Sequence, residues 1–83
     1  NLASMRYAYN RRIAQRPGIA GKITYKFAID EYGVVVFCQV LNTTMNDEVF
    51  ENILTEKIKN WRFERIYRPR DVTEVVYPFV FTQ

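Results

Sequence analysis

The sequence predicts an α+β domain in which two helices cover one face of a three-stranded antiparallel sheet. Three observations carry this prediction. The chain has 83 residues, of which 48% are hydrophobic, so it can build one core and has no room for a second. Apolar residues recur at helical spacing in two segments and follow a strand pattern in three others. These segments run in the order helix, strand, strand, helix, strand.

The first helix is expected over residues 2–15. Pro17 and Gly18 end it, because proline cannot continue a helix and glycine favours its termination. The face expected to pack on the sheet consists of Leu2, Met5, Tyr9 and Ile13, which are spaced three and four residues apart.

A β-hairpin is expected to follow. Residues 22–29 alternate between polar and apolar side chains, and residues 30–33 form a tight turn in which Gly33 supplies the positive φ. Residues 34–41 are nearly all apolar or β-branched, which indicates a strand whose alternation is blurred by a bulge. Tyr25 and Phe27 could form an aromatic platform for RNA, but they share the face that must cover the helices, which favours core positions.

The second helix is expected to begin after an N-cap at Thr44 or Asn46 and to end around Trp61. Its apolar stripe for packing on the sheet is Phe50, Leu54, Ile58 and Trp61, with Trp61 as the largest core side chain. Val49 and Ile53 flank this stripe and make it continuous. Residues 65–71 are a polar loop, and residues 72–82 are the last strand, which contains Pro78.

The connections fix the order of the strands. A hairpin makes the first two strands antiparallel, so in a wholly antiparallel sheet the third strand lies beside the first, which gives the order 2-1-3. Pro78 agrees with this placement, because a residue without an N–H is tolerated at a sheet edge. The last strand is therefore predicted to be an exposed edge.

The composition argues against an enzyme. His is absent, Ser4 is the single serine, and no glycine-rich run could cradle a phosphate. Cys38 is the single cysteine, so it can form neither an internal disulfide nor a cysteine metal site, and it is expected to be a small core residue. We expect no cofactor and no metal.

Charge falls in blocks along the chain. Residues 1–29 hold six basic residues and no acidic one, and residues 30–56 hold six acidic residues and no basic one. Basic residues return afterwards and include Arg65, Arg68 and Arg70. The first two blocks could neutralise each other across the fold, or the basic residues could form a patch for an anionic partner.

The chain has neither a stretch apolar enough to cross a bilayer nor a signal-peptide pattern. It begins without Met and inside an expected helix, so we expect residues 1–83 to be one domain of a longer protein, with any membrane anchor upstream.

The last strand has two interpretations. It could be an edge blunted by Pro78 and the basic loop, or it could bind an extended partner segment through its main chain by β-augmentation.

Several motifs resemble the C-terminal domain of the TonB superfamily, and within it the AgmX/PglI type of gliding-motility and related envelope proteins. They are G-x-I-x-Y-x-F-x-I-D-x-x-G-x-V over residues 21–35, N-W-R-F over residues 60–63 and Y-P-F-V-F over residues 77–81. The likeness covers nearly the whole chain. AgmX-type domains often carry cysteines at the position of Ala8 and near Ile53, which this chain lacks, and Glu64 stands where they often have proline.

The resemblance implies a non-catalytic periplasmic domain of an inner-membrane-anchored protein that grips an outer-membrane or other envelope partner. Upstream it implies a link to an inner-membrane motor, with a role in transport or motility. The final edge strand would take up the partner. Carried over to this chain, the partner-binding residues are Val72, Thr73, Glu74, Val75 and Val76, with Arg65, Arg68 and Arg70 as a rim.

Two alternatives remain open. A basic nucleic-acid-binding module would use the sheet aromatics and the arginines of the loop, and its affinity would fall steeply with salt. An exposed edge could also pair with a second copy and form a homodimer.

Overall fold

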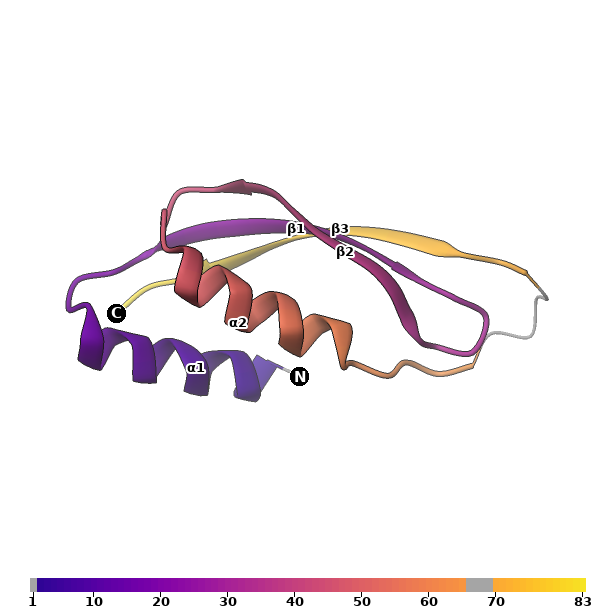
Figure 1. Cartoon of the computed structure of the whole chain (residues 1–83), viewed down its shortest axis with the longest axis horizontal. Coiled ribbons are helices and arrows are strands. Elements are labelled where there is room, and N and C mark those ends of the chain that lie inside the picture. Colours follow the sequence, from indigo (N-terminus) through magenta and orange to yellow (C-terminus); the bar gives the residue numbers. More distant parts are fainter. Residues whose placement is uncertain (1, 66–69) are drawn as a thin grey trace.

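The computed structural model of the protein describes residues 2–65 and 70–83 (Figure 1). The elements are α1 (Leu2–Gln15), β1 (Gly21–Ile29), β2 (Val35–Thr43), α2 (Glu48–Lys59) and β3 (Thr73–Phe81). The three strands form one antiparallel sheet in the order β2-β1-β3, and both helices lie on the same face of it. The predicted fold class and strand order are confirmed. Neither helix within residues 2–65 and 70–83 is long and apolar enough to cross a membrane.

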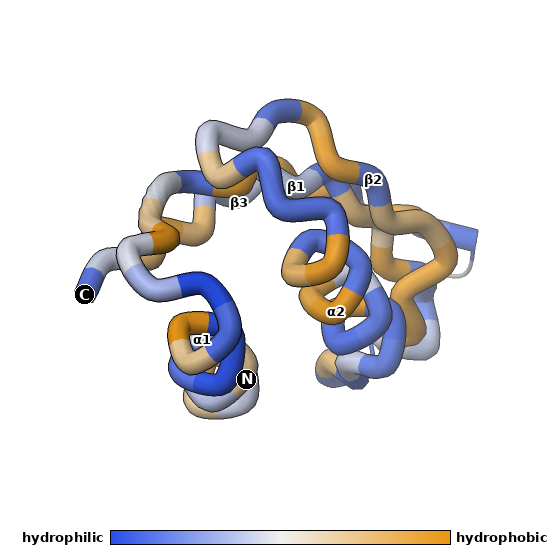
Figure 2. Tube along the Cα trace, turned by 60° about the vertical axis from the view of Figure 1, so that its left-hand side comes forward, coloured by the Kyte–Doolittle hydropathy of each residue, from blue (hydrophilic) through white to orange (hydrophobic). Residues whose placement is uncertain are grey.

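The helix α1 is amphipathic, but its buried face begins later in the helix than predicted. Met5, Ala8 and Tyr9 are buried, and the Tyr9 hydroxyl donates a hydrogen bond to the Ile19 carbonyl. Leu2, which was expected on the same buried face, is 63% exposed. In Figure 2, α1 lies beneath the β3 side of the sheet, and within residues 2–65 and 70–83 no strand lies beyond β3 to cover Leu2.

The hairpin has the predicted turn. Gly33 has a φ of 80°, and the Asp30 carboxylate accepts hydrogen bonds from the N–H groups of Tyr32 and Val34. The pairing of β2 with β1 shifts register twice, between Thr24 and Tyr25 and between Ala28 and Ile29. These irregularities confirm the predicted disturbance in β2.

The N-cap of α2 is Asp47, so the prediction of Thr44 or Asn46 is wrong. The Thr44 hydroxyl is already engaged, because it accepts a hydrogen bond from the Lys22 N–H at 2.9 Å. Asp47 accepts from the Phe50 N–H, and its own N–H donates to the Glu51 carboxylate. The acidic cap stabilises the positive end of the helix dipole.

Trp61 is not the last residue of the helical stripe. The helix α2 ends at Lys59 with Asn60 as its C-cap, and Arg62 forms an isolated antiparallel bridge with Val34. Trp61 is half-buried and packs edge-on against Phe27, with ring centroids 6.0 Å apart. It therefore closes the side of the core instead of filling its centre.

The centre of the core is formed by β1 and α2. Tyr25 is fully buried and Phe27 is 4% exposed, which confirms them as core residues. The Tyr25 hydroxyl donates to the Glu51 carbonyl at 2.8 Å and also contacts the Thr55 hydroxyl, while burial raises the pKa of Tyr25 to about 12. The fully buried side chains of α2 are Phe50, Leu54 and Ile58, whereas Val49 and Ile53, which were expected to flank them, are exposed.

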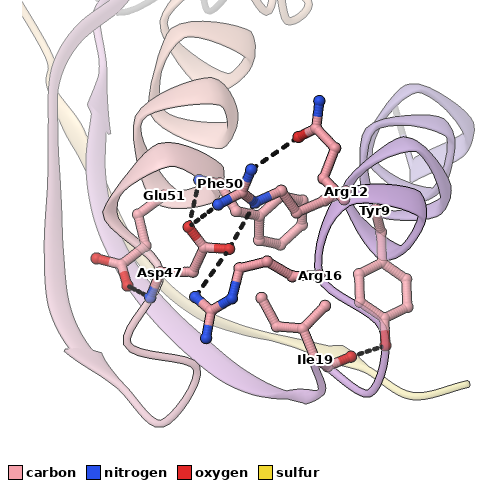
Figure 3. A network of polar contacts seen from close by, with 8 residues as sticks. Tyr9, Arg12, Arg16, Ile19, Asp47, Phe50 and Glu51 are labelled. Atoms are coloured by element: carbon pink, nitrogen blue, oxygen red, sulfur yellow. Dashed lines mark hydrogen bonds and ion pairs between the residues drawn. The ribbon is translucent and has the colours of Figure 1, made fainter.

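A buried ion pair fastens α1 to the start of α2 (Figure 3). Arg12 donates to both oxygens of Asp47, at 2.7 and 3.1 Å, and Arg16 lies 3.5 Å from the same carboxylate. Asp47 is 2% exposed, and the hydrogen bond from Arg12 lowers the pKa of its carboxyl. At this site the basic first block does neutralise the acidic middle of the chain.

Candidate functional site at the edge strand

The strand β3 forms one edge of the sheet and is its most regular strand. It pairs with β1 from Gly21↔Phe81 to Ile29↔Thr73 without a register shift. Within residues 2–65 and 70–83, no strand lies on its far side. Pro78 stands in this edge strand, as predicted. It lies opposite Thr24 of β1. The far side of β3 is therefore open to a further strand.

Hydrogen bonds at the two ends of β1 show which way its backbone groups point. The Thr44 N–H donates to the Lys22 carbonyl at 2.9 Å, and the Asp30 N–H donates to the Val34 carbonyl at 2.9 Å. Lys22 and Asp30 thus both direct a backbone group toward the β2 side. Successive residues of an antiparallel strand bond to opposite neighbours. The odd-numbered residues of β1 therefore bond to β3.

The same alternation assigns the backbone of β3. Val75 lies opposite Phe27 and Tyr77 opposite Tyr25, so these two residues turn their N–H and C=O groups inward to β1. The even-numbered residues turn theirs outward. Pro78 fits this parity, because its missing N–H would otherwise be required by β1. The outward N–H groups in β3 are those of Glu74, Val76 and Val80.

The parity divides the predicted binding residues into two sets. Glu74 and Val76 present outward backbone groups, whereas Thr73 and Val75 direct theirs to β1. Val72 precedes the strand and is 56% exposed. The outward backbone groups therefore belong to every second residue of the predicted set and extend to Val80, which the sequence motifs did not single out.

The side chains of β3 alternate between the two faces of the sheet. Val76 is 57% exposed on the face opposite the helices, next to an ion pair of Lys26 Nζ with Glu74 Oε2 at 3.5 Å. On the helix face, Val75 is half-buried, and Phe79 and Phe81 are buried. The strand is thus anchored at its C-terminal end and exposed along its first half.

A groove of about 340 Å³ runs between α1 and the C-terminal half of β3. From α1, Leu2, Met5 and Arg6 line it, and Arg6 Nη1 donates to the Thr82 carbonyl at 3.2 Å. From β3, residues 77–81 line it, including Tyr77, which is 48% exposed. Sequence reasoning missed this groove, and the single signal for it was the position of Leu2 on the apolar face of α1.

The structure describes two of the three predicted rim arginines. Arg65 and Arg70 are exposed, and the Arg65 guanidinium lies over the Tyr32 ring, 5.0 Å from its centroid. Arg65 therefore sits against the β1–β2 turn. Arg68 lies outside the described residues.

The described residues give little support to a nucleic-acid surface on the sheet aromatics or to a metal site. Tyr25 and Phe27 are buried on the helix face of the sheet, and Phe27 packs against Trp61 and Phe63, so they cannot stack on nucleic-acid bases. No group of three or more metal-ligating His, Cys, Asp or Glu residues is found in the described part of the chain. Cys38 is half-buried, and burial raises the pKa of its thiol.

Comparisons of the chain with protein-family models, with curated proteins and with solved structures find no match. The resemblance to TonB C-terminal domains therefore stays a prediction from the sequence motifs.

Proposed function

We propose that this protein is a non-catalytic binding module that takes up an extended segment of a partner as a fourth strand beside β3. The observation that carries the proposal is the outward row of backbone groups at Glu74, Val76 and Val80 on an edge without register shifts. Following the resemblance, we place the domain in the periplasm, on an inner-membrane-anchored protein, with an outer-membrane or other envelope protein as its partner. It would then tether or couple the inner-membrane machinery to that partner.

Main-chain pairing would supply the affinity. Each hydrogen bond formed with the outward groups contributes roughly 0.5–1.5 kcal/mol net. Pro78 offers a carbonyl and no N–H, so one partner carbonyl near it would find no donor there. The added strand would also cover exposed apolar surface, namely Val76 and Val80 on one face and Tyr77 on the other.

The test is photocrosslinking in living cells from a photoreactive residue at Glu74, which is exposed and next to the outward backbone of Val76. The captured partner is identified by mass spectrometry. We expect an outer-membrane or periplasmic protein. We also expect Val76→Pro to abolish capture and Val76→Ala, which shortens the same side chain but keeps the N–H, to preserve most of it.

Two outcomes would contradict the proposal. Capture that is equal in the Val76→Pro and Val76→Ala variants would show that main-chain pairing is not used. Capture of nothing, or of another copy of this chain alone, in cells that express the domain normally would make β3 a blunted or dimerising edge.

A further inference from the structure

The two helices leave a second groove, on the opposite side of α1 from β3. They run antiparallel beside each other (Figure 1), and a groove of about 240 Å³ lies between their exposed sides. Its walls are Tyr7, Ala8, Arg11, Arg12 and Gln15 from α1 and Ile53 and Lys57 from α2. Strand addition at β3 leaves this groove unused.

The groove is positively charged. Three of the residues that line it are basic and none is acidic. Arg12 is already committed, because its Nε and Nη2 donate to Asp47 (Figure 3) and its Nη1 donates to the Gln15 side chain. Arg12 therefore fixes one wall of the groove and has little capacity left for a ligand.

Arg11 and Lys57 have capacity left. The Arg11 guanidinium lies 5.9 Å from the centroid of the Tyr7 ring, a contact that leaves its N–H donors free to bond elsewhere. Lys57 Nζ donates to the Ser4 hydroxyl at 2.7 Å, which uses one of its three donors. Within residues 2–65 and 70–83, neither cation forms an ion pair.

Apolar surface accompanies these cations. Ile53 is 40% exposed and Tyr7 is 62% exposed. Val49, one turn before Ile53 on α2, is 52% exposed and extends the apolar surface. Val49 and Ile53 lie outside the buried residues of α2, and Tyr7 lies outside the buried residues of α1, so the packing of the domain does not explain their apolar character.

We propose that this groove binds an acidic segment of a protein partner, with carboxylates at Arg11 and Lys57 and an apolar side chain between Tyr7 and Ile53. Charge complementarity selects an acidic occupant. Ala8 forms the floor and is 7% exposed, so the site is recessed and suits protruding side chains better than a flat bilayer surface.

The experiment uses a displayed library of random short peptides as its probe. The library is selected in parallel against the wild-type domain and against the double variant Arg11→Glu/Lys57→Glu. The matched control is Lys22→Glu/Arg62→Glu, which changes the net charge equally at two exposed positions outside the groove. Circular dichroism checks that each variant is folded.

We expect acidic residues, spaced around an apolar one, to be enriched by the wild type and by the control, and not by the groove variant. A recovered peptide should bind the groove variant at least about tenfold more weakly than the control, and its affinity should fall with added salt. Val76→Pro should leave this binding unchanged, because it acts at the other site.

Three results would overturn the proposal. They are the recovery of no peptide, peptides without acidic enrichment, and equal affinity for the groove variant and the control. Groove-dependent binding to vesicles of phosphatidylglycerol and phosphatidylcholine, without peptide binding, would assign the groove to lipid and overturn it as well.

Discussion

The two edges of the sheet differ in their backbones more than in their hydrophobicity. On β2, Leu41 and Val36 have no partner on β1 at the two register shifts and are 49% and 56% exposed. On β3, Val76 and Val80 are exposed to a similar degree, 57% and 64%, but the register is continuous over nine residues. Bulges displace an edge from the path of an incoming strand. Regular backbone geometry, and not apolar character, therefore distinguishes β3 from β2, and it favours β3 as the edge for the proposed added strand.

The edge at β2 is also covered at its beginning. Arg62 forms an antiparallel bridge with Val34, and the Phe63 N–H donates to the Gly33 carbonyl at 2.9 Å. No comparable segment lies along β3 within residues 2–65 and 70–83. The chain itself thus pairs with the residues just before β2, whereas within residues 2–65 and 70–83 nothing pairs with the outer side of β3.

The largest effect is expected from proline placed at the two parities of β3. Val75→Pro removes an N–H that bonds to β1 and should destabilise the domain by roughly 3 kcal/mol or more, or prevent folding. Val76→Pro removes an outward N–H and should cost about 1 kcal/mol or less. Urea unfolding followed by circular dichroism measures both. Equal losses of stability would break the assignment of outward groups on β3.

Gly33→Ala tests how the covered edge is fastened. A Cβ at this position would overlap the Phe63 carbonyl, and the positive φ would be strained as well. We expect a loss of about 2–3 kcal/mol in the free energy of unfolding. Gly18→Ala is the control, because it has a similar φ of 88° and open space around the added Cβ, and it should cost only about 1 kcal/mol. A similar loss in both variants would show that the contact between Phe63 and the hairpin contributes little.

Asp47→Ala tests the ion pair that holds α1 in place beneath the β3 edge. The variant leaves Arg12 half-buried without its carboxylate and removes the N-cap of α2, so we expect a loss of about 2 kcal/mol. Asp47→Asn, which keeps a cap acceptor, should lose less. Thermal unfolding of both variants at neutral pH compares them.

The same carboxyl gives a pH dependence. Its pKa is lowered in the folded state, so the unfolded chain binds the proton more tightly at acid pH. The stabilisation is complete above the ordinary Asp pKa of about 4 and is lost as the pH falls below that value. Unfolding measured from pH 6 downward should show this loss in the wild type and a smaller one in Asp47→Asn. Identical pH profiles would contradict it.

The smallest effect is expected from the ion pair on the open face of β3. Lys26 and Glu74 are both substantially exposed, so Glu74→Gln should change the free energy of unfolding by about 0.2–1 kcal/mol. The difference should vanish at high salt. A larger or salt-independent effect would mean that Glu74 has a structural role at this edge beyond a screened surface pair.

Part of the difference between the two edges could be predicted from the sequence alone. Pro78 and the hairpin turn at Gly33 placed β3 at an edge, and the blurred alternation of residues 34–41 indicated the irregular β2. The parity of β3 could not be predicted, because it depends on which residue of β1 stands opposite which residue of β3. The groove at α1 and β3 was missed for the same reason, since its walls are far apart in the sequence.

The sequence by itself determined the order of the elements, the antiparallel sheet, the core positions of Tyr25 and Phe27 and the edge position of the last strand, because hydrophobic period, turn residues and proline act locally. The tertiary structure decided the cap at Asp47, the exposure of Leu2 and the place of Trp61 beside the core. Each of these depends on how distant segments meet. Lys22 engages the Thr44 hydroxyl, and the chain after Lys59 turns to meet Val34. Leu2 is left exposed because, within residues 2–65 and 70–83, no strand lies beyond β3.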